Sequence, residues 1–164
     1  MSRPNANSSD FGEFGPRSAF NLVALSSVKP LSVLDSRSLE LDRQALSILR
    51  QNEWGGYTLP TRGLYPYQWN WDSMFVALGF AEFDLDRAWT EVDTLFQGQW
   101  ANGMAAHIVF RKDDPSYFPG PSIWGGDGGQ LPTSGCSQPP VALTVVRDLY
   151  ERNPTAGRSY LEEL

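Results

Sequence analysis

Apolar residues recur at helical spacing through most of the chain from Ser38 onward. The clearest run is Leu85–Phe96, which carries apolar residues on one face and follows Asp84, a residue type that favours the N-cap position. Trp89 falls on that apolar face, so we expect it in the core and not at a ligand. Three other segments share the helical pattern: Ser38–Leu49, Met74–Leu78, and a stretch that opens at Pro139-Pro140 and stops at Asn153-Pro154.

Alternation with a period of two is almost absent from the chain. Only Ala105–Phe110 is predicted as a short extended piece. The pattern therefore predicts an all-α fold, with a fifth helix barely begun at Leu164. Two connections, Asn52–Trp69 and Gly98–Gln138, are far longer than the roughly 2–8 residues usual between packed helices. Long loops rich in aromatic residues favour a functional site.

Composition predicts one domain preceded by a tail. The 164 residues have the length of a single domain, and 41% hydrophobic residues are enough for one core. Residues 1–35 are rich in Ser, Asn, Pro and Gly, which predicts a loosely ordered N-terminal tail before a domain at 36–164. The tail lacks the pattern of a secretory signal, and no segment approaches the ~20 apolar residues of a membrane span. We therefore expect a soluble, cytoplasmic protein.

Charge and metal-ligand content limit the partners. A net charge of -6 leaves no basic stripe for phosphates, so we expect neither nucleic acid nor a membrane as a partner. The single cysteine and single histidine give no zinc-ligand spacing, so we expect no metal and no cofactor. Cys136 is predicted to be a small buried hydrophobe and not a nucleophile. His107 is predicted to be a wall residue that can line a pocket, with a proton shuttle as the less favoured alternative.

The stretch Leu64–Ser73 is the most informative part of the chain. It combines four aromatic rings with one carboxylate, Asp72. Aromatic faces cover the C–H surface of a pyranose, and a carboxylate accepts charge-assisted hydrogen bonds from sugar hydroxyls. The alternative is a buried aromatic cluster in which Asp72 caps the following helix. Spacing alone leaves both interpretations open.

Six blocks of sequence, taken in order, resemble one enzyme family. They are Trp54–Thr58, Leu64–Ser73, Gln97–Met104, His107–Phe110, Tyr117–Pro121 and Ser134–Val141. From about Leu34 to its end, the chain resembles the opening third of the mannosylglycerate and glucosylglycerate hydrolases of glycoside hydrolase family 63. Trp71-Asp72-Ser73 is also similar to an element of trehalases. The resemblance implies that residues 36–164 are the N-terminal part of an (α/α)6 barrel, truncated at the C-terminus.

The resemblance also implies which residues bind the substrate. They are Tyr65, Trp69, Trp71, Asp72, Tyr117 and Gln138. Trp71, Asp72 and Gln138 match positions that hold the sugar in the subsite where the bond is cut, and Trp69 lies beside them. Tyr65 and Tyr117 match positions that reach the glycerate side. A carboxylate, an amide and several ring faces also suit a polyol on chemical grounds.

The catalytic pair of the family is not recognisable in this chain. The resemblance implies an inverting enzyme, in which an acid and a base stand about 6.5–9.5 Å apart around a water molecule. Both are expected beyond Leu164, so we expect the chain alone to be inactive. The remaining loop acids, Asp113, Asp114 and Asp127, stand among Pro, Ser and Gly and are assigned to solvated turns.

Two other interpretations stay open. The main interpretation is a fragment of an inverting hydrolase of a small α-glycoside. The first alternative is a non-catalytic module that binds sugar or a partner, and the second is a truncated reading frame without a function. A partial barrel would leave apolar faces uncovered. Expected partners are therefore a small glycoside substrate and either the missing C-terminal part of the barrel or a second copy of the chain.

Overall fold

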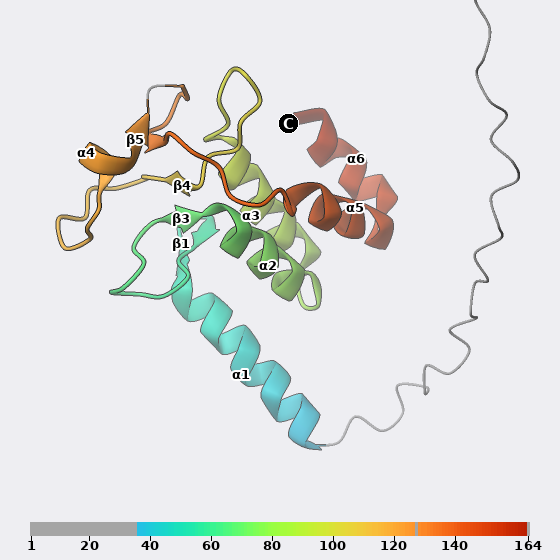
Figure 1. The fold of residues 1–164 in the computed structure, drawn as a ribbon. Coiled ribbons are helices and arrows are strands. Elements are labelled where there is room, and N and C mark those ends of the chain that lie inside the picture. Colours follow the sequence, from blue (N-terminus) through green and yellow to red (C-terminus); the bar gives the residue numbers. More distant parts are fainter. Residues whose placement is uncertain (1–35, 127, 164) are drawn as a thin grey trace, which may run out of the picture. The chain divides into compact units, whose positions relative to one another are not determined.

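The computed structural model describes residues 36–126 and 128–163 (Figure 1). These residues contain six helices and six short strands joined by loops. The helices are α1 (Ser36–Asn52), α2 (Asn70–Ala81), α3 (Leu85–Phe96), α4 (Pro121–Trp124), α5 (Ala142–Arg152) and α6 (Pro154–Glu163). The strands are β1 (Glu53–Trp54), β2 (Tyr57–Thr58), β3 (Gln68–Trp69), β4 (Ile108–Val109), β5 (Gly125–Gly126) and β6 (Thr133–Ser134). The predicted tail, residues 1–35, lies outside the described residues.

The core forms where α2, α3 and α5 pack together, with α6 against α3 and α5. Both features that predicted α3, the N-cap Asp84 and the apolar face with Trp89, are confirmed. The Asp84 carboxylate accepts a hydrogen bond from the Arg87 N–H at 3.0 Å and so caps the helix. Trp89 is fully buried and stacks on Tyr160 with ring centroids 5.1 Å apart.

The C-terminal helices differ from the prediction in their bounds. A fifth helix that had barely begun was expected at Leu164, yet α6 already spans ten residues. Pro154 is well suited to start it, because its fixed φ fits the first helical position and its missing N–H has no partner there. The start of α5 is Ala142 and not Pro139-Pro140, because the Val141 N–H turns back to the Pro139 carbonyl at 2.8 Å. Among the described helices, none has the length and apolar character needed to cross a membrane.

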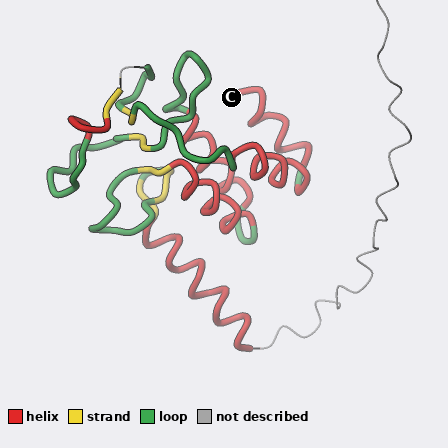
Figure 2. Tube along the Cα trace, in the orientation of Figure 1, coloured by secondary structure: helices red, strands yellow, loops and turns green. Residues whose placement is uncertain are grey.

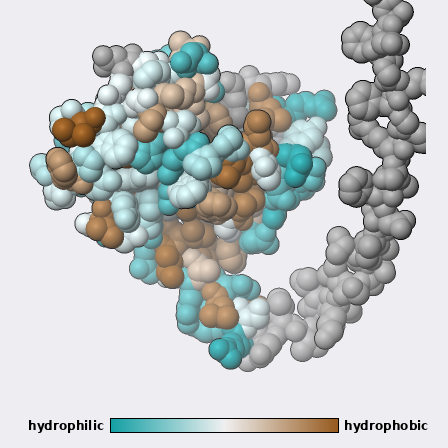
Figure 3. Space-filling model, in the orientation of Figure 1, coloured by the Kyte–Doolittle hydropathy of each residue, from teal (hydrophilic) through white to brown (hydrophobic). Residues whose placement is uncertain are grey.

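Helix α1 exposes most of the face that its sequence pattern predicted to pack, which consists of Leu41, Ala45, Ile48 and Leu49. Leu41 and Ile48 are 57% and 58% exposed, and Ala45 is exposed too. From the predicted face, Leu49 packs against the core as expected, and Leu46 does so as well. Figure 3 shows hydrophobic side chains at the surface on α1 and over α2. Periodicity reveals that a helix has an apolar face, but not whether another element covers it.

The all-α prediction is not confirmed, because the described residues also hold two small antiparallel sheets. Strands β1 and β2 pair, and a four-stranded sheet has the order β3-β4-β6-β5. Each strand has only two residues, too few to show a period of two in the sequence. The predicted extended piece, Ala105–Phe110, contains β4. Figure 2 shows the loops and strands gathered on one side of the helices.

Candidate functional site

A hollow of about 410 Å³ opens beside the N-terminus of α2. We call it the Asp72 pocket. Its lining residues are Pro60, Thr61, Tyr65, Trp69, Trp71, Asp72 and Gln138. Five of the six predicted substrate-binding residues are among them. The sixth, Tyr117, lies next to the pocket, with its ring centroid 5.5 Å from that of Trp69 and 6.4 Å from that of Tyr65. The structure thus brings together residues from three distant parts of the chain.

The passage from β3 into α2 places the polar side chains of the pocket. Trp69 is the N-cap residue of α2 and provides no side-chain cap, while Asp72 is the third residue of the helix. The interpretation of Asp72 as the N-cap is therefore wrong. The Trp71 N–H instead donates to Gln138 Oε1 at 3.0 Å, across 67 positions of sequence. A distant loop thus satisfies one of the N–H groups that a helix start leaves unpaired.

Asp72 and His107 influence each other electrostatically at the edge of this pocket. Partial burial raises the pKa of Asp72 above its ordinary value, against the opposing effects of hydrogen bonds from its own backbone and the Trp71 side chain. Burial lowers the pKa of His107, and the nearby Asp72 charge opposes that shift. Perturbed titratable groups beside a cavity are typical of functional sites.

Aromatic rings form the wall of the Asp72 pocket. Trp69 is 6% exposed and meets the rings of Tyr65 and Tyr67 at centroid distances of 5.4 and 5.9 Å. Tyr65 and Trp71 each remain 41% exposed. The buried Trp69 ring packs against the exposed Tyr65 ring, and an exposed ring face is available to the C–H groups of a ligand.

His107 and Cys136 lie beside the pocket. The His107 carbonyl accepts from the Asn70 N–H at 3.0 Å, and the His107 N–H donates to the Cys136 carbonyl at 2.7 Å. The His107 ring is half-buried, with its centroid 5.2 Å from that of Trp124, which agrees with the predicted wall residue. Cys136 is exposed, so its prediction as a buried hydrophobe is wrong. The chain around it follows the surface before it turns into α5.

The loop acids do not converge on the pocket. Asp113 is exposed, and Asp114 accepts from the Ser116 N–H at 3.2 Å, as expected in a turn. Hydrogen bonds from Ser116 and the nearby Lys112 charge hold the pKa of Asp114 below its ordinary value. Asp127 lies outside the described residues. Among the described side chains, no three of His, Cys, Asp or Glu gather as metal ligands would.

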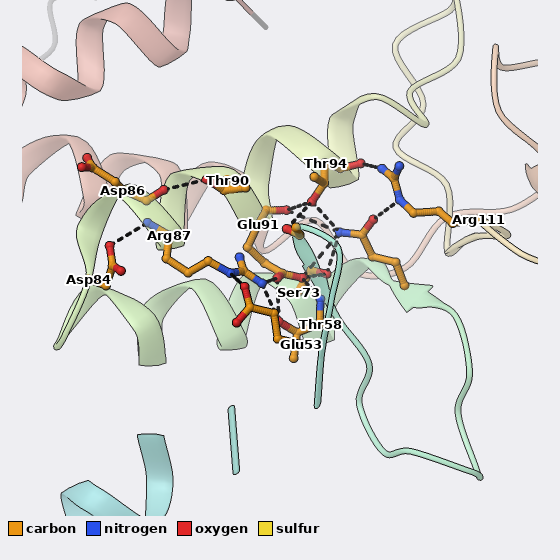
Figure 4. A network of polar contacts seen from close by, with 12 residues as sticks. Glu53, Thr58, Ser73, Asp84, Asp86, Arg87, Thr90, Glu91, Thr94 and Arg111 are labelled. Atoms are coloured by element: carbon orange, nitrogen blue, oxygen red, sulfur yellow. Dashed lines mark hydrogen bonds and ion pairs between the residues drawn. The ribbon is translucent and has the colours of Figure 1, made fainter. Parts of the chain in front are cut away.

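Sequence reasoning missed a buried polar network behind the pocket (Figure 4). Glu91 is 0% exposed, although it belongs to the otherwise apolar face of α3. It accepts hydrogen bonds from Thr58 and from Ser73, the residue after Asp72. The signal that could have revealed it is spacing, because Glu91 stands three residues after Ala88 and four before Leu95, both on the apolar face.

Comparison with known proteins identifies one group of hydrolases. Residues 65–164 match the family described as the mannosylglycerate hydrolase MGH1-like glycoside hydrolase domain. The chain is similar to mannosylglycerate hydrolase MGH1 of Selaginella moellendorffii, with 51% identity over 120 residues, which cover 73% of this chain and 24% of the relative. It is also similar to the glucosylglycerate hydrolase of Mycolicibacterium hassiacum, with 42% identity over 127 residues, which cover 73% of this chain and 28% of the relative.

A solved structure gives the same result. The chain is similar to the GH63 mannosylglycerate hydrolase from Thermus thermophilus, crystallised in complex with Tris and D-glycerate, with a TM-score of 0.67 and 48% identity. The similarity covers 73% of this chain and 29% of that chain. The resemblance seen in the sequence is therefore confirmed. The chain spans 24% and 28% of the two curated relatives, or about a quarter of their length.

Proposed function

Because this chain belongs to the MGH1-like glycoside hydrolase family, we propose that it is the N-terminal part of an inverting hydrolase of a small α-glycoside, glucosylglycerate or mannosylglycerate. One observation carries the proposal. The Asp72 pocket joins a carboxylate, an amide and three aromatic rings in a hollow of about 410 Å³, within the size range of small-molecule sites. We propose that Tyr65, Trp69, Trp71, Asp72, Tyr117 and Gln138 bind the substrate.

Each group has a distinct task in this proposal. The Asp72 carboxylate accepts hydrogen bonds from two sugar hydroxyls, since an ionised acceptor binds hydroxyl groups more strongly than a neutral one. Gln138 uses its oxygen on the Trp71 N–H, and its NH₂ group is the donor for a sugar oxygen. The Trp71 face covers the C–H surface of the pyranose. The phenol groups of Tyr65 and Tyr117 donate to the glycerate end.

We assign the acid and base of the reaction to residues beyond Leu164. Inverting glycosidases need two carboxyl groups on opposite sides of the scissile bond, about 6.5–9.5 Å apart. In the described part of the chain, Asp72 is the single carboxylate in the pocket lining. We therefore expect no hydrolysis by the chain alone. Residues 36–164 would then be the first part of an (α/α)6 barrel, and the location would be cytoplasmic.

Titration with the two glycosides tests this proposal. We expect mannosylglycerate or glucosylglycerate to release or absorb heat on binding to the chain, and Asp72→Asn to weaken that binding. Asp86→Asn is the matched control, because Asp86 also lies in the first turn of a helix but is exposed on α3, outside the pocket. Equal affinity of the wild type and Asp72→Asn for both glycosides would refute the assignment of Asp72.

A sugar-binding module without catalysis is the second candidate. The single carboxylate in the described pocket lining favours it, because this arrangement supports binding without hydrolysis. The genomic sequence downstream of the Leu164 codon separates the two candidates. A continuing reading frame with paired acidic motifs favours the hydrolase, and its absence favours the module.

A further inference from the structure

Glu91 concentrates its hydrogen bonds on the segments that build the Asp72 pocket. Its Oε1 accepts from the Ser73 hydroxyl at 2.6 Å and from the Thr58 N–H at 3.2 Å. Its Oε2 accepts from the Thr58 hydroxyl at 2.8 Å and from Arg87 Nη2 at 2.9 Å. The side chain of Gln68 also reaches it, with Nε2 at 3.5 Å from Oε1 and at 3.1 Å from the Ser73 hydroxyl. Figure 4 shows the side chains of Thr58, Ser73 and Arg87 gathered around Glu91.

The contacts of Glu91 bracket the pocket residues of β3 and α2. Gln68 directly precedes Trp69, and Ser73 directly follows Asp72. The segment Trp69–Asp72, which contributes three lining residues, is therefore held at both ends by one side chain of α3. Its middle is held separately, because Asn70 Nδ2 donates to the carbonyls of Ala105 and Ala106 at 3.2 Å each.

The far side of Gln68 is anchored as well. Arg111 Nε donates to Gln68 Oε1 at 3.0 Å, and the Arg111 guanidinium also contacts the Thr94 carbonyl of α3. The Gln68 amide is thereby fixed in orientation, with its oxygen toward Arg111 and its NH₂ group toward Glu91. Apart from Arg87 Nη1, which is buried without a hydrogen-bond partner, the side chains of this network are paired, and a paired network favours one arrangement of its members.

Glu91 forms an ion pair with the largely buried Arg87, which offsets part of the cost of burying its charge. Burial of a charged group costs free energy, and an apolar residue of similar volume is often as stable or more stable at such a site. A hydrogen-bonded carboxylate instead specifies the position of the groups that donate to it. Binding groups function when they are held within about 0.5 Å of the productive geometry.

We propose that Glu91 is a positioning residue for the sugar subsite. Through Gln68 and Ser73 it sets where Trp69, Trp71 and Asp72 stand relative to α3. The inference rests on the proposed function for one point, that the ligand of the Asp72 pocket is a sugar. The placement of the Trp69–Asp72 segment by Glu91 is a property of the protein without ligand.

Amide hydrogen exchange on the full chain tests this placement. In Glu91→Leu, we expect the amides of Asn70 and Trp71 to exchange roughly tenfold faster, because this segment loses the bond from Ser73, one of those that Glu91 accepts. The amides of α5 should change little. In Glu91→Gln, the retained oxygen still accepts from Ser73 and Thr58, so the Asn70 and Trp71 amides should stay as slow as in the wild type. A purely structural role would instead speed exchange everywhere, as we expect for the core variant Val92→Ala.

The outcomes separate this inference from the proposed function. Unchanged exchange at Asn70 and Trp71 in Glu91→Leu, or equal acceleration throughout the chain, would overturn the positioning role. If Glu91→Leu does not fold, Ser73→Ala replaces it, because this variant removes one donor to Glu91. The Asn70 and Trp71 amides should then exchange faster than in the wild type, while the amides of α5 change little. Titration with mannosylglycerate then tests the link to binding, with affinity expected to drop in Glu91→Leu and persist in Glu91→Gln. A wild-type chain that binds no glycoside would refute the proposed function, and the exchange result would still decide the role of Glu91.

Discussion

Gln138 is expected to serve two functions that two substitutions can separate. Its oxygen accepts from the Trp71 N–H at 3.0 Å, so Gln138→Ala leaves a backbone donor at the start of α2 without its partner. Loss of a capping acceptor costs about 0.5–2 kcal/mol. The site is half-buried, so water can replace part of the bond, and we expect a loss of about 1 kcal/mol. For a folded unit of this size, that is a shift of roughly 4 °C in the melting temperature.

Gln138→Glu is expected to keep the cap and lose the donor. A carboxylate near a helix N-terminus gains about 0.3–1 kcal/mol from the helix dipole. Repulsion from Asp72 in the same pocket opposes that gain, so the melting temperature should stay near that of the wild type. The variant lacks the NH₂ group that we assign to the sugar, and the added charge raises the pKa of Asp72 further. Glycoside binding should therefore weaken although the fold is intact.

Thermal melts followed by circular dichroism, together with calorimetric titration on the same samples, measure both effects. Gln99→Ala is the control, because the Gln99 amide donates to the Gly103 carbonyl in an exposed loop and caps no helix. An unchanged melting temperature in Gln138→Ala would show that the bond to Trp71 has no structural value. Wild-type affinity in Gln138→Glu would show that the amide donor is not used.

Three further predictions concern stability and association. Burial raises the pKa of Asp72, so ionisation of this carboxyl destabilises the folded state as the pH rises through the folded-state pKa. At about pH 7, Asp72→Asn should therefore resist urea better than the wild type. Below about pH 3 the wild-type carboxyl is protonated, and this advantage should vanish. Gly98→Ala would place a Cβ 2.7 Å from Val109 Cγ2, and a thermal melt should show the roughly 1–3 kcal/mol loss of an overpacked core. The exposed Leu41 and Ile48 on α1 should make the chain associate, so sedimentation should show a concentration-dependent mass that Leu41→Glu with Ile48→Glu lowers to that of the monomer.

Local signals in the sequence were sufficient for α3. Asp84 and the apolar face through Trp89 act within one or two helical turns, so their structure follows from neighbours in the chain. The exposed face of α1 and the exposed Cys136 depend instead on what lies over them, which spacing does not encode. The strands are equally non-local, because a two-residue strand such as β4 is defined only by its partners β3 and β6.

The candidate site was predictable in composition but not in geometry. From the residues alone, the rings near Asp72 left a sugar pocket and a buried cluster equally open, and the resemblance to family 63 favoured the pocket and added Tyr117 and Gln138. The bond from Trp71 to Gln138 spans 67 positions, beyond the reach of any local pattern. The same holds for Glu91, whose acceptor role emerges only when Thr58 and Ser73 are placed beside it in space.

The pairing of β3 with β4 and β6 has a consequence for the order of folding. Helices α2 and α3 are joined by three residues and can meet early, because closing a short loop costs little entropy. The sheet must close a far longer stretch before Trp69 meets Ile108 and Val109 meets Thr133. Contacts of this kind form late and slow the overall rate. We therefore expect the pocket wall to assemble after the helical core, and substitutions in β4 or β6 should accelerate unfolding more than they slow folding.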